Sequence, residues 1–444
     1  MKRNVCLILA LCLTVSLFAA CATNQPPAAV SEASSAASQS QTPESSAGQE
    51  QYDPMAYAGE SLVMLRHTGY DADWMNEQFA DFTKETGINV TMEQVAFSQL
   101  HDKIVVDLSA GSGSYDIIAT PDYWLPEFTE GDWLADLRAC IANPTAYDPT
   151  FDIDDIPQSL QEACSDGDKL VALPWKFNAT ILYYRSDLLP TPPATWDDLL
   201  DLAKQNTGDV KGIGMSMSKT SLPDVYNSML VAFGGKLLSD DAKTCLLDSP
   251  EALEALNFLI ELNSYGVEGS LSRHWDESAV LLAQGNTMTE IMVNTQVGNV
   301  TDPEKSQFPN DIAFAPLPEK VTRGAFMNTW TLAVTNGCET PEAGWALLQY
   351  LMSKEKLADL VEKTNGGIAP SRTSLLSDPQ LSAKYPLFET MNATAEKGAF
   401  AAPKTSQWST ILEVLATHVQ NALTGSEAPQ AALDSAKKEI DAVL

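Results

Sequence analysis

Apolar runs of strand length alternate with amphipathic stretches through the first part of the chain. Met75, Phe79 and Phe82 recur at helical spacing, whereas the run SLVMLRH is nearly continuous and INVTMEQV alternates. The predicted elements, in chain order, are a strand at 61–67, a helix at 70–85, a strand at 88–95, a helix at 97–110 and a strand at 115–120. Strands that alternate with amphipathic helices predict an α/β fold with a mostly parallel sheet.

The same alternation continues in the second half of the chain. Thr195 stands at the position of a helix N-cap, and Trp196 and Leu199 follow on one helical face. The further predicted elements are a helix after 195, a strand at 211–216, helices at 222–233 and from 249, and long helices at 341–363, 408–423 and 428–444. The body beyond residue 58 is too long for one ordinary core, so we expect two domains.

The N-terminus has the pattern of an export signal. Lys2 and Arg3 precede an apolar run at 5–17 that is short for a membrane span, and small residues follow it. The sequence LFAAC at 17–21 resembles the lipobox of bacterial lipoproteins, which implies that residues 1–20 are removed and Cys21 is lipidated. An ordinary signal peptide with a chance cysteine is the alternative. Residues 21–58 are rich in Ala, Ser, Gln, Pro and Glu, so we expect a disordered tether.

The net charge and the spacing of cysteine and histidine residues limit the kinds of partner and cofactor that we expect. The chain has a formal net charge of −32, and removal of residues 1–20 makes it −34. Such a charge disfavours nucleic acid and anionic lipid headgroups. The four cysteines after Cys21 show no zinc spacing and the four histidines are far apart, so no metal or cofactor is expected. Cys140 and Cys164 are able to pair outside the cytoplasm.

Eight segments of the body carry motifs of one known family, in its order. They are LHDKI with AGSGSYDII at 100–118, GDWLADL at 131–137, DKLVALP at 168–174, LYYRSDL at 182–188, PPATWDDL at 192–199, GG at 234–235, SPEA at 249–252 and GGIAPSR at 366–372. Together they resemble the extracellular solute-binding proteins of ABC importers, in the branch that includes the maltodextrin-binding proteins. The resemblance implies a periplasmic-binding-protein-like fold of class II type, with lobe 1 at 59–174 plus 329–366 and lobe 2 at 178–325 plus 370–444.

Candidate ligand-binding residues lie where this family places its cleft. A sugar site needs aromatic platforms and polar groups that form paired hydrogen bonds. The candidates are Asp122, Trp124, Trp175, Asn178, Trp330, Arg372 and Trp408. Asp122 and Trp124 follow the third strand, at the edge where open α/β sheets bind ligands. Core packing is the alternative for each tryptophan, and a structural salt bridge is the alternative for Arg372. We interpret Trp74, Trp133, Trp196 and Trp345 as core residues.

The resemblance implies a function without catalysis. We expect a lipid-anchored, monomeric receptor on the extracytoplasmic face of the cell membrane, which captures a sugar, oligosaccharide or polyol by hinge closure. It would deliver this ligand to the permease subunits of an ABC transporter. The same role for a peptide, polyamine or phosphate ester stays open. So does a secreted glycoside hydrolase, which needs two carboxylates about 5–10 Å apart, although GxSxG, HExxH and P-loop motifs are missing from the sequence.

Overall fold

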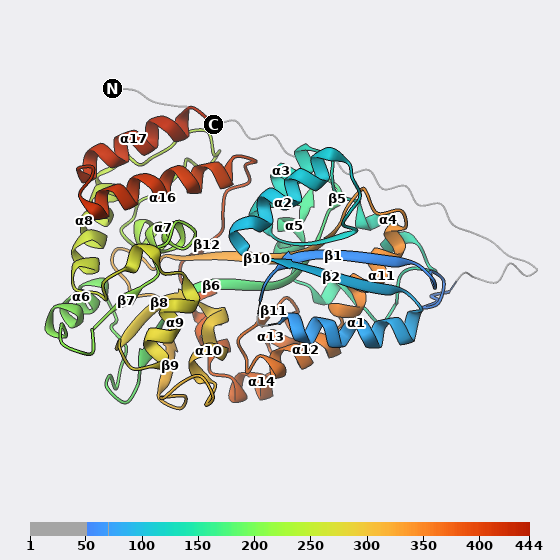
Figure 1. Cartoon of the computed structure of the whole chain (residues 1–444), viewed down its shortest axis with the longest axis horizontal. Helices are drawn as coiled ribbons and strands as arrows, with labels where there is room; N and C mark the ends of the chain where they lie inside the picture. Colours follow the sequence, from blue (N-terminus) through green and yellow to red (C-terminus); the bar gives the residue numbers. More distant parts are fainter. Residues whose placement is uncertain (1–50, 70) are drawn as a thin grey trace, which may run out of the picture. The chain divides into compact units, whose positions relative to one another are not determined.

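The computed structural model describes residues 51–69 and 71–444, and Figure 1 gives its elements. The predicted signal peptide, Cys21 and most of the predicted tether lie outside the described residues. Residues 51–58 were expected in the tether, but the structure places them against the body. The Asp53 N–H donates to the carbonyl of Thr145 at 3.2 Å, and Tyr57 packs on the core beneath. The described chain therefore folds onto the body before residue 59.

One large sheet connects distant parts of the chain. Its strand order is β2 (Asn89–Val95), β1 (Ser61–His67), β3 (Ile117–Pro121), β10 (Ala325–Val334), β6 (Leu173–Arg185), β8 (Thr289–Val293) and β7 (Gly214–Met215). β9 (Ile312–Ala315) and β11 (Ala369–Pro370) also pair with β6, and β12 (Ala399–Phe400) pairs with β10. β4 (Ser165–Asp166) and β5 (Lys169–Leu170) form a separate two-stranded sheet.

The prediction of a mostly parallel sheet is wrong at the centre. β1 pairs parallel with β2 and β3, and β7 pairs parallel with β8. The central pairs β3–β10, β10–β6 and β6–β8 are antiparallel. The cause is the pair of long strands β6 and β10, which run in opposite directions and join the two parallel groups. The fold is mixed α/β.

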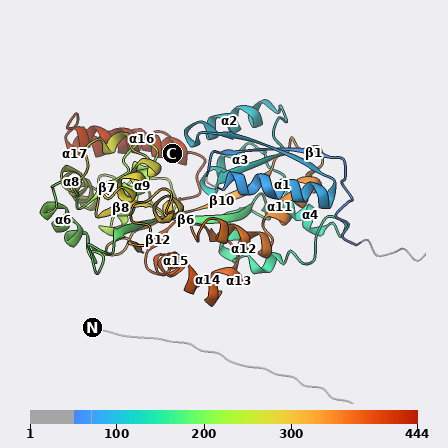
Figure 2. The ribbon, with the colours of Figure 1, turned by 60° about the horizontal axis from the view of Figure 1, so that its bottom comes forward.

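Helices cover both groups of parallel strands (Figures 1 and 2). In the first half they are α1 (Ala72–Thr86), α2 (Phe97–Ala110), α3 (Leu125–Glu130), α4 (Leu137–Ala142), α5 (Gln158–Ala163), α6 (Trp196–Gln205) and α7 (Leu222–Ala232). Next come α8 (Pro250–Ser264), α9 (Trp275–Ala283), α10 (Val297–Thr301), α11 (Pro341–Leu351), α12 (Lys354–Lys363) and α13 (Thr373–Leu376). The last are α14 (Pro379–Lys384), α15 (Leu387–Glu396), α16 (Trp408–Thr424) and α17 (Pro429–Asp441). Within the described part of the chain, no helix combines the length and apolar character needed to cross a bilayer.

Local signals in the sequence account for several boundaries. The strand at 61–67 and the helix at 97–110 are confirmed with the predicted limits. Thr195 forms a capping box with Asp198, whose N–H donates to Thr195 Oγ1 at 3.1 Å. The predicted helix at 341–363 is divided, because Ser353 caps a new helix by accepting from the Lys356 N–H. The predicted strand at 211–216 is confirmed over Gly214–Met215.

Two large hydrophobic cores lie toward opposite ends of β6 and β10, and a third, small cluster contains Val361, Tyr385 and Phe388. The first core holds the buried side chains around β1 and β3, and the second holds those around α7 and α8. Trp175, Trp330 and Ile368 belong to the first core, whereas Phe177, Phe326 and Ala369 belong to the second. The chain therefore passes between the cores at three places, within β6, within β10 and at β11. This is the architecture of a two-lobed fold with hinge crossings.

The core predictions hold for three of four tryptophans. Trp196 and Trp345 are fully buried, Trp74 is 4% exposed, and Trp133 is half-buried against the first core. Cys140, Cys164, Cys245 and Cys338 are buried free thiols. The disulfide considered for Cys140 and Cys164 is therefore not formed in this structure.

Candidate functional site

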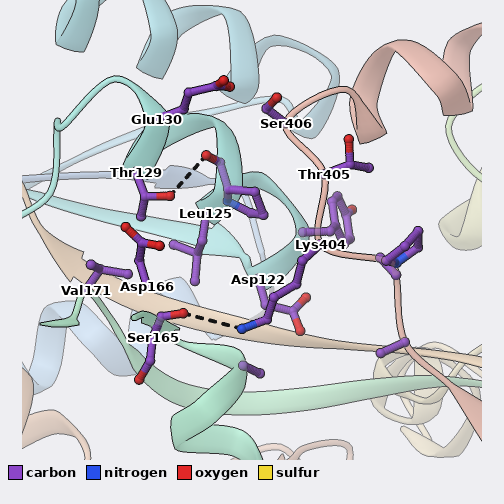
Figure 3. A pocket seen from close by; sticks show the side chains of 16 residues that line it. Asp122, Leu125, Thr129, Glu130, Ser165, Asp166, Val171, Lys404, Thr405 and Ser406 are labelled. Carbon is purple, nitrogen blue, oxygen red and sulfur yellow. Dashed lines mark hydrogen bonds between the residues drawn. The ribbon is translucent and has the colours of Figure 1, made fainter. Parts of the chain in front are cut away.

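A cavity of about 560 Å³ lies between the carboxyl end of β3 and the segment 401–406 (Figure 3). The 3₁₀ turn η1 (Asp122–Trp124) and α3 form one wall, and the segment that connects β12 to α16 forms the other. Its polar lining includes Asp122, Tyr123, Glu130, Asp166 and Lys404. Three carboxylates against one ammonium give this cavity an acidic character.

Asp122 is placed in the cavity by the strand that precedes it. Pro121, the last residue of β3, pairs with Trp330 of β10, which fixes the turn that follows. Burial raises the pKa of Asp122 to about 7, although N–H groups of Thr329 and Tyr123 donate to its carboxylate and oppose this rise. Among the described residues, its Oδ1 is buried without a hydrogen-bond partner. A buried acceptor without a partner is costly, and a ligand hydroxyl would satisfy it.

A second carboxylate, which the sequence analysis missed, lies near Tyr123. Asp224 is in the first turn of α7, and burial raises its pKa to about 7. Burial raises the pKa of Tyr123 strongly, and the negative fields of Asp224 and Asp122 add to this rise. Asp224 belongs to α7, which packs in the second core, and Asp122 follows β3, which packs in the first. Tyr123, between them, packs against both cores. In sequence, Asp224 is indistinguishable from an acid that stabilises a helix N-terminus.

Trp124 and Trp330 are brought together in an aromatic cluster. Trp124 stacks on Phe97 with ring centroids 5.5 Å apart, and Phe97 lies 6.0 Å from Trp330. Both tryptophans are buried, with 5% and 6% of their surface exposed. With its amide oriented so that the oxygen faces the indole, Asn178 accepts a hydrogen bond from Trp330 Nε1 at 3.1 Å. The cluster therefore stabilises the end of β3 behind the cavity.

Trp408 lies on the other side of the segment 401–403 from Asp122. It begins α16 and lines a second cavity of about 480 Å³ together with Asn227 and Phe400. The two cavities share Ala401 and Pro403 as a common wall. The structure therefore places Trp408 beside the acidic cavity but not in its lining.

Trp175 and Arg372 lie deeper in the fold. Trp175 is fully buried, and Lys176 Nζ lies 4.4 Å from its ring centroid. Arg372 donates to the carbonyls of Met352 and Phe151, both at 2.7 Å, and forms an ion pair with Asp155. These contacts give Arg372 the structural role that was the alternative to ligand binding.

A buried ion network fixes the loop after β1 to the hinge. Arg66 and Lys176 both pair with Asp71, with Lys176 Nζ 2.6 Å from Asp71 Oδ2. Burial alone would raise the pKa of Asp71, but the positive charges of Lys176 and Arg66 outweigh it and hold this pKa well below its usual range. Burial also lowers the pKa of His67 to about 3. The network joins β1, the start of α1 and β6.

Groups of three or more His, Cys, Asp or Glu side chains able to hold a metal ion do not occur among the residues that the structure describes. The carboxylate oxygens that line the acidic cavity can accept hydrogen bonds from the hydroxyl groups of a neutral molecule.

Comparison with known proteins identifies the family. The model of the bacterial extracellular solute-binding protein family matches residues 67–358. A probable amino-acid ABC transporter periplasmic-binding protein of Sinorhizobium fredii is 25% identical over 75% of this chain and 77% of its own length. The mannitol-binding protein of Pseudomonas aeruginosa is 24% identical over 74% of this chain and 78% of its own length.

Solved structures share the fold. An ABC transporter solute-binding protein from Agrobacterium radiobacter, in complex with ribitol, superposes with a TM-score of 0.79 and 21% identity. The match covers 88% of this chain and all of the other. The family match includes β2, β3, β6, β7, β8 and β10 and covers more than half of the chain, so the chain belongs to the bacterial extracellular solute-binding protein family.

Proposed function

We propose that this protein is an extracytoplasmic receptor for a neutral sugar or polyol, which it delivers to an ABC transporter permease. The observation that carries the proposal is the buried acceptor of Asp122 in the cavity of about 560 Å³. Hydroxyl groups of a polyol are hydrogen-bond donors that satisfy such an acceptor. The mannitol-binding relative and the ribitol complex of a protein with the same fold support this class of ligand.

The proposed mechanism is closure of the two lobes around the ligand. In this proposal lobe 1 comprises 59–174 plus 329–366, and lobe 2 comprises 178–325 plus 370–444. The ligand docks on the carboxylate of Asp122, and closure adds Asp224 from the start of α7. Closure is favoured by the difference in ligand affinity between the open and closed states.

The remaining candidates act around this cavity in the proposal. Trp408 contributes an aromatic surface at the edge of the cleft, and Trp124 and Trp330 hold Asp122 in place through the cluster behind it. Trp175, Asn178 and Arg372 act through the hinge rather than by stacking on the ligand. Cys21 carries the lipid that retains the monomeric receptor at the membrane, beside its permease.

A thermal-shift screen of the purified protein tests the proposed ligand class. The panel contains D-mannitol, ribitol, erythritol, maltose, amino acids, short peptides and polyamines. A ligand at 100 times its dissociation constant stabilises the folded state by about 2.7 kcal/mol, which raises the melting temperature measurably. We expect at least one neutral sugar or polyol to raise it. A shift with polyamines, peptides or amino acids and none with carbohydrate would contradict the proposal.

The chemical state of the bound ligand after incubation distinguishes a receptor from a glycoside hydrolase. We expect the bound molecule to be recovered unaltered after long incubation, because the function requires release of the intact solute to the permease. Chromatography of the recovered ligand makes this measurement. Stoichiometric recovery supports a receptor, whereas product that accumulates beyond one equivalent would establish an enzyme.

A further inference from the structure

Lys404 reaches across the acidic cavity from one lobe to the other. It belongs to the segment between β12 and α16, which forms one wall. Its Nζ donates to the carbonyl of Glu162 at 2.8 Å and to that of Ser165 at 3.3 Å. Figure 3 shows the side chain extending beside Asp122 toward Ser165. One ammonium group thus connects lobe 2 to the end of α5 and the start of β4.

The carbonyls that Lys404 meets are suited to a cation. The last carbonyls of a helix lack partners within that helix, and Lys side chains commonly satisfy them. Glu162 is in the last turn of α5, and Ser165 follows two residues after that helix ends. The ammonium also lies close enough to Asp122 to favour the charged form of its carboxylate.

Other polar contacts also join residues of the two lobes. After β11, Arg372 and Ser374 contact Asp155, and Lys384 of α14 pairs with Glu362 of α12. Asn294 Nδ2 donates to the carbonyl of Gly367 at 3.4 Å, and Asn365 Nδ2 donates to Thr301 Oγ1 at 3.0 Å. α10 and α12, which lead to these contacts, lie on the side of β6 and β10 opposite to α16 and α3 (Figures 1 and 2). The Lys404 contact is therefore placed where the cleft would open.

We infer that Lys404 is a clasp that stabilises the closed arrangement independently of the ligand and thereby sets its affinity and residence time. This inference rests on the proposed function, because a clasp matters in a receptor that opens and closes. Lys404 acts as a positioning residue. A shift in the ligand-free population toward the closed state raises apparent affinity in proportion to the competent fraction.

The clasp can be tested without any ligand. Spin labels on a ketone-bearing unnatural residue at positions 106 and 321 leave the cysteines unlabelled, and Val106 and Val321 are 68% and 72% exposed. Pulsed dipolar spectroscopy then reports the distance distribution of the full chain. We expect Lys404→Met to lower the ratio of short to long distances about threefold or more, since a hydrogen bond to a charged group is lost. Lys404→Arg should retain most of the short distances.

Two controls distinguish loss of the Lys404 contact from the loss of a surface charge and from unfolding. Lys397→Met removes a charge from an exposed position near the same segment and should leave the distances unchanged. Circular dichroism and the melting temperature of Lys404→Met should match those of the parent. Because the acceptors are neutral carbonyls, 0.5 M NaCl should leave the short distances in place, whereas pairing with carboxylates would be screened.

Identical distance distributions for the parent and Lys404→Met would overturn the inference. Loss of the short distances in Lys397→Met as well would also overturn it, because a charge effect would then explain the change. Failure of D-mannitol, ribitol and the other probes to bind is a separate result. It would contradict the proposed ligand class and leave the ligand-free distances to decide the clasp.

Discussion

Trp330 of β10 lies against His67 at the end of β1, with ring centroids 4.2 Å apart and planes inclined by 34°. The contact joins a hinge-crossing strand to the loop that begins after β1. His67 Nδ1 is buried without a partner among the described side chains and backbone. Trp330 therefore packs a hinge-crossing strand against the end of β1.

Replacing Trp330 by Ala should lower the free energy of unfolding by about 3–5 kcal/mol, the usual cost of deleting a buried tryptophan. The control is Trp133→Ala, because Trp133 is half-buried and its loss should cost less. Urea denaturation measures both. Equal losses in the two variants would contradict the packing role of Trp330.

Replacing Asp122 by Asn should flatten the pH dependence of stability. The pKa of Asp122 is raised from 3.8 to about 7 by burial. Between these pH values the folded chain holds a proton that the unfolded chain has lost, so stability falls as pH rises through the window. Unfolding at pH 4, 5.5 and 7 measures the slope, which Asp122→Asn should reduce.

The matched control for this slope is Asp201→Asn, at an exposed position of α6. It should leave the pH dependence as in the parent. Asp224→Asn should also reduce the slope, because burial raises the pKa of Asp224 to about 7. A slope in Asp122→Asn that equals the parent's would show that Asp122 is ionised in the folded chain throughout this range.

Removing the cation of Lys176 should destabilise the hinge strongly. Lys176→Met breaks one of the two ion pairs of the buried Asp71 and leaves the pair with Arg66, and breaking a buried pair costs about 3–5 kcal/mol. Lys169→Met is the control, since Lys169 and Asp132 form an exposed pair at 3.2 Å and such pairs contribute about 0–1 kcal/mol. A loss below about 1 kcal/mol in Lys176→Met would contradict the network's role.

The acidic cavity should discriminate against anionic ligands. Glu130 and Asp166 line it, so the carboxylate of D-gluconate would meet like charges that neutral D-sorbitol avoids. We expect D-gluconate to bind at least about tenfold more weakly than D-sorbitol, if D-sorbitol binds, and Glu130→Gln to narrow the gap. Competition calorimetry measures the ratio. Equal affinities would contradict the electrostatic description of the cavity.

Local patterns in the sequence predicted elements better than connections. The limits of β1 and α2 follow from periodicity and from Gly111, which ends α2 in a left-handed conformation. The thirteen-residue length of β6 and its antiparallel pairing with β10 depend on residues about 150 positions apart. Such pairings are set by tertiary packing, which local periodicity does not contain.

The sequence also identified only some of the residues that line the candidate site, because tertiary packing decides which side chains reach it. Asp122 is a candidate because it follows a strand at the edge where open α/β sheets bind ligands, and the structure places it in the lining of the cavity. Asp224 was missed because an acid in the first turn of a helix is common. For Trp175 and Arg372, residue type indicated recognition chemistry, but side-chain direction decides the role, and both side chains point into packed regions.

Equilibrium binding measurements test whether the protein binds a neutral polyol or sugar and whether Asp122 takes part in that binding. Isothermal titration of the parent, Asp122→Asn and Asp201→Asn with D-mannitol, ribitol, erythritol and maltose gives the affinity and stoichiometry. We predict one site for at least one of these ligands, with an affinity about tenfold or more weaker in Asp122→Asn and unchanged in Asp201→Asn. This prediction is contradicted if none of them binds the parent, or if Asp122→Asn binds as tightly as the parent.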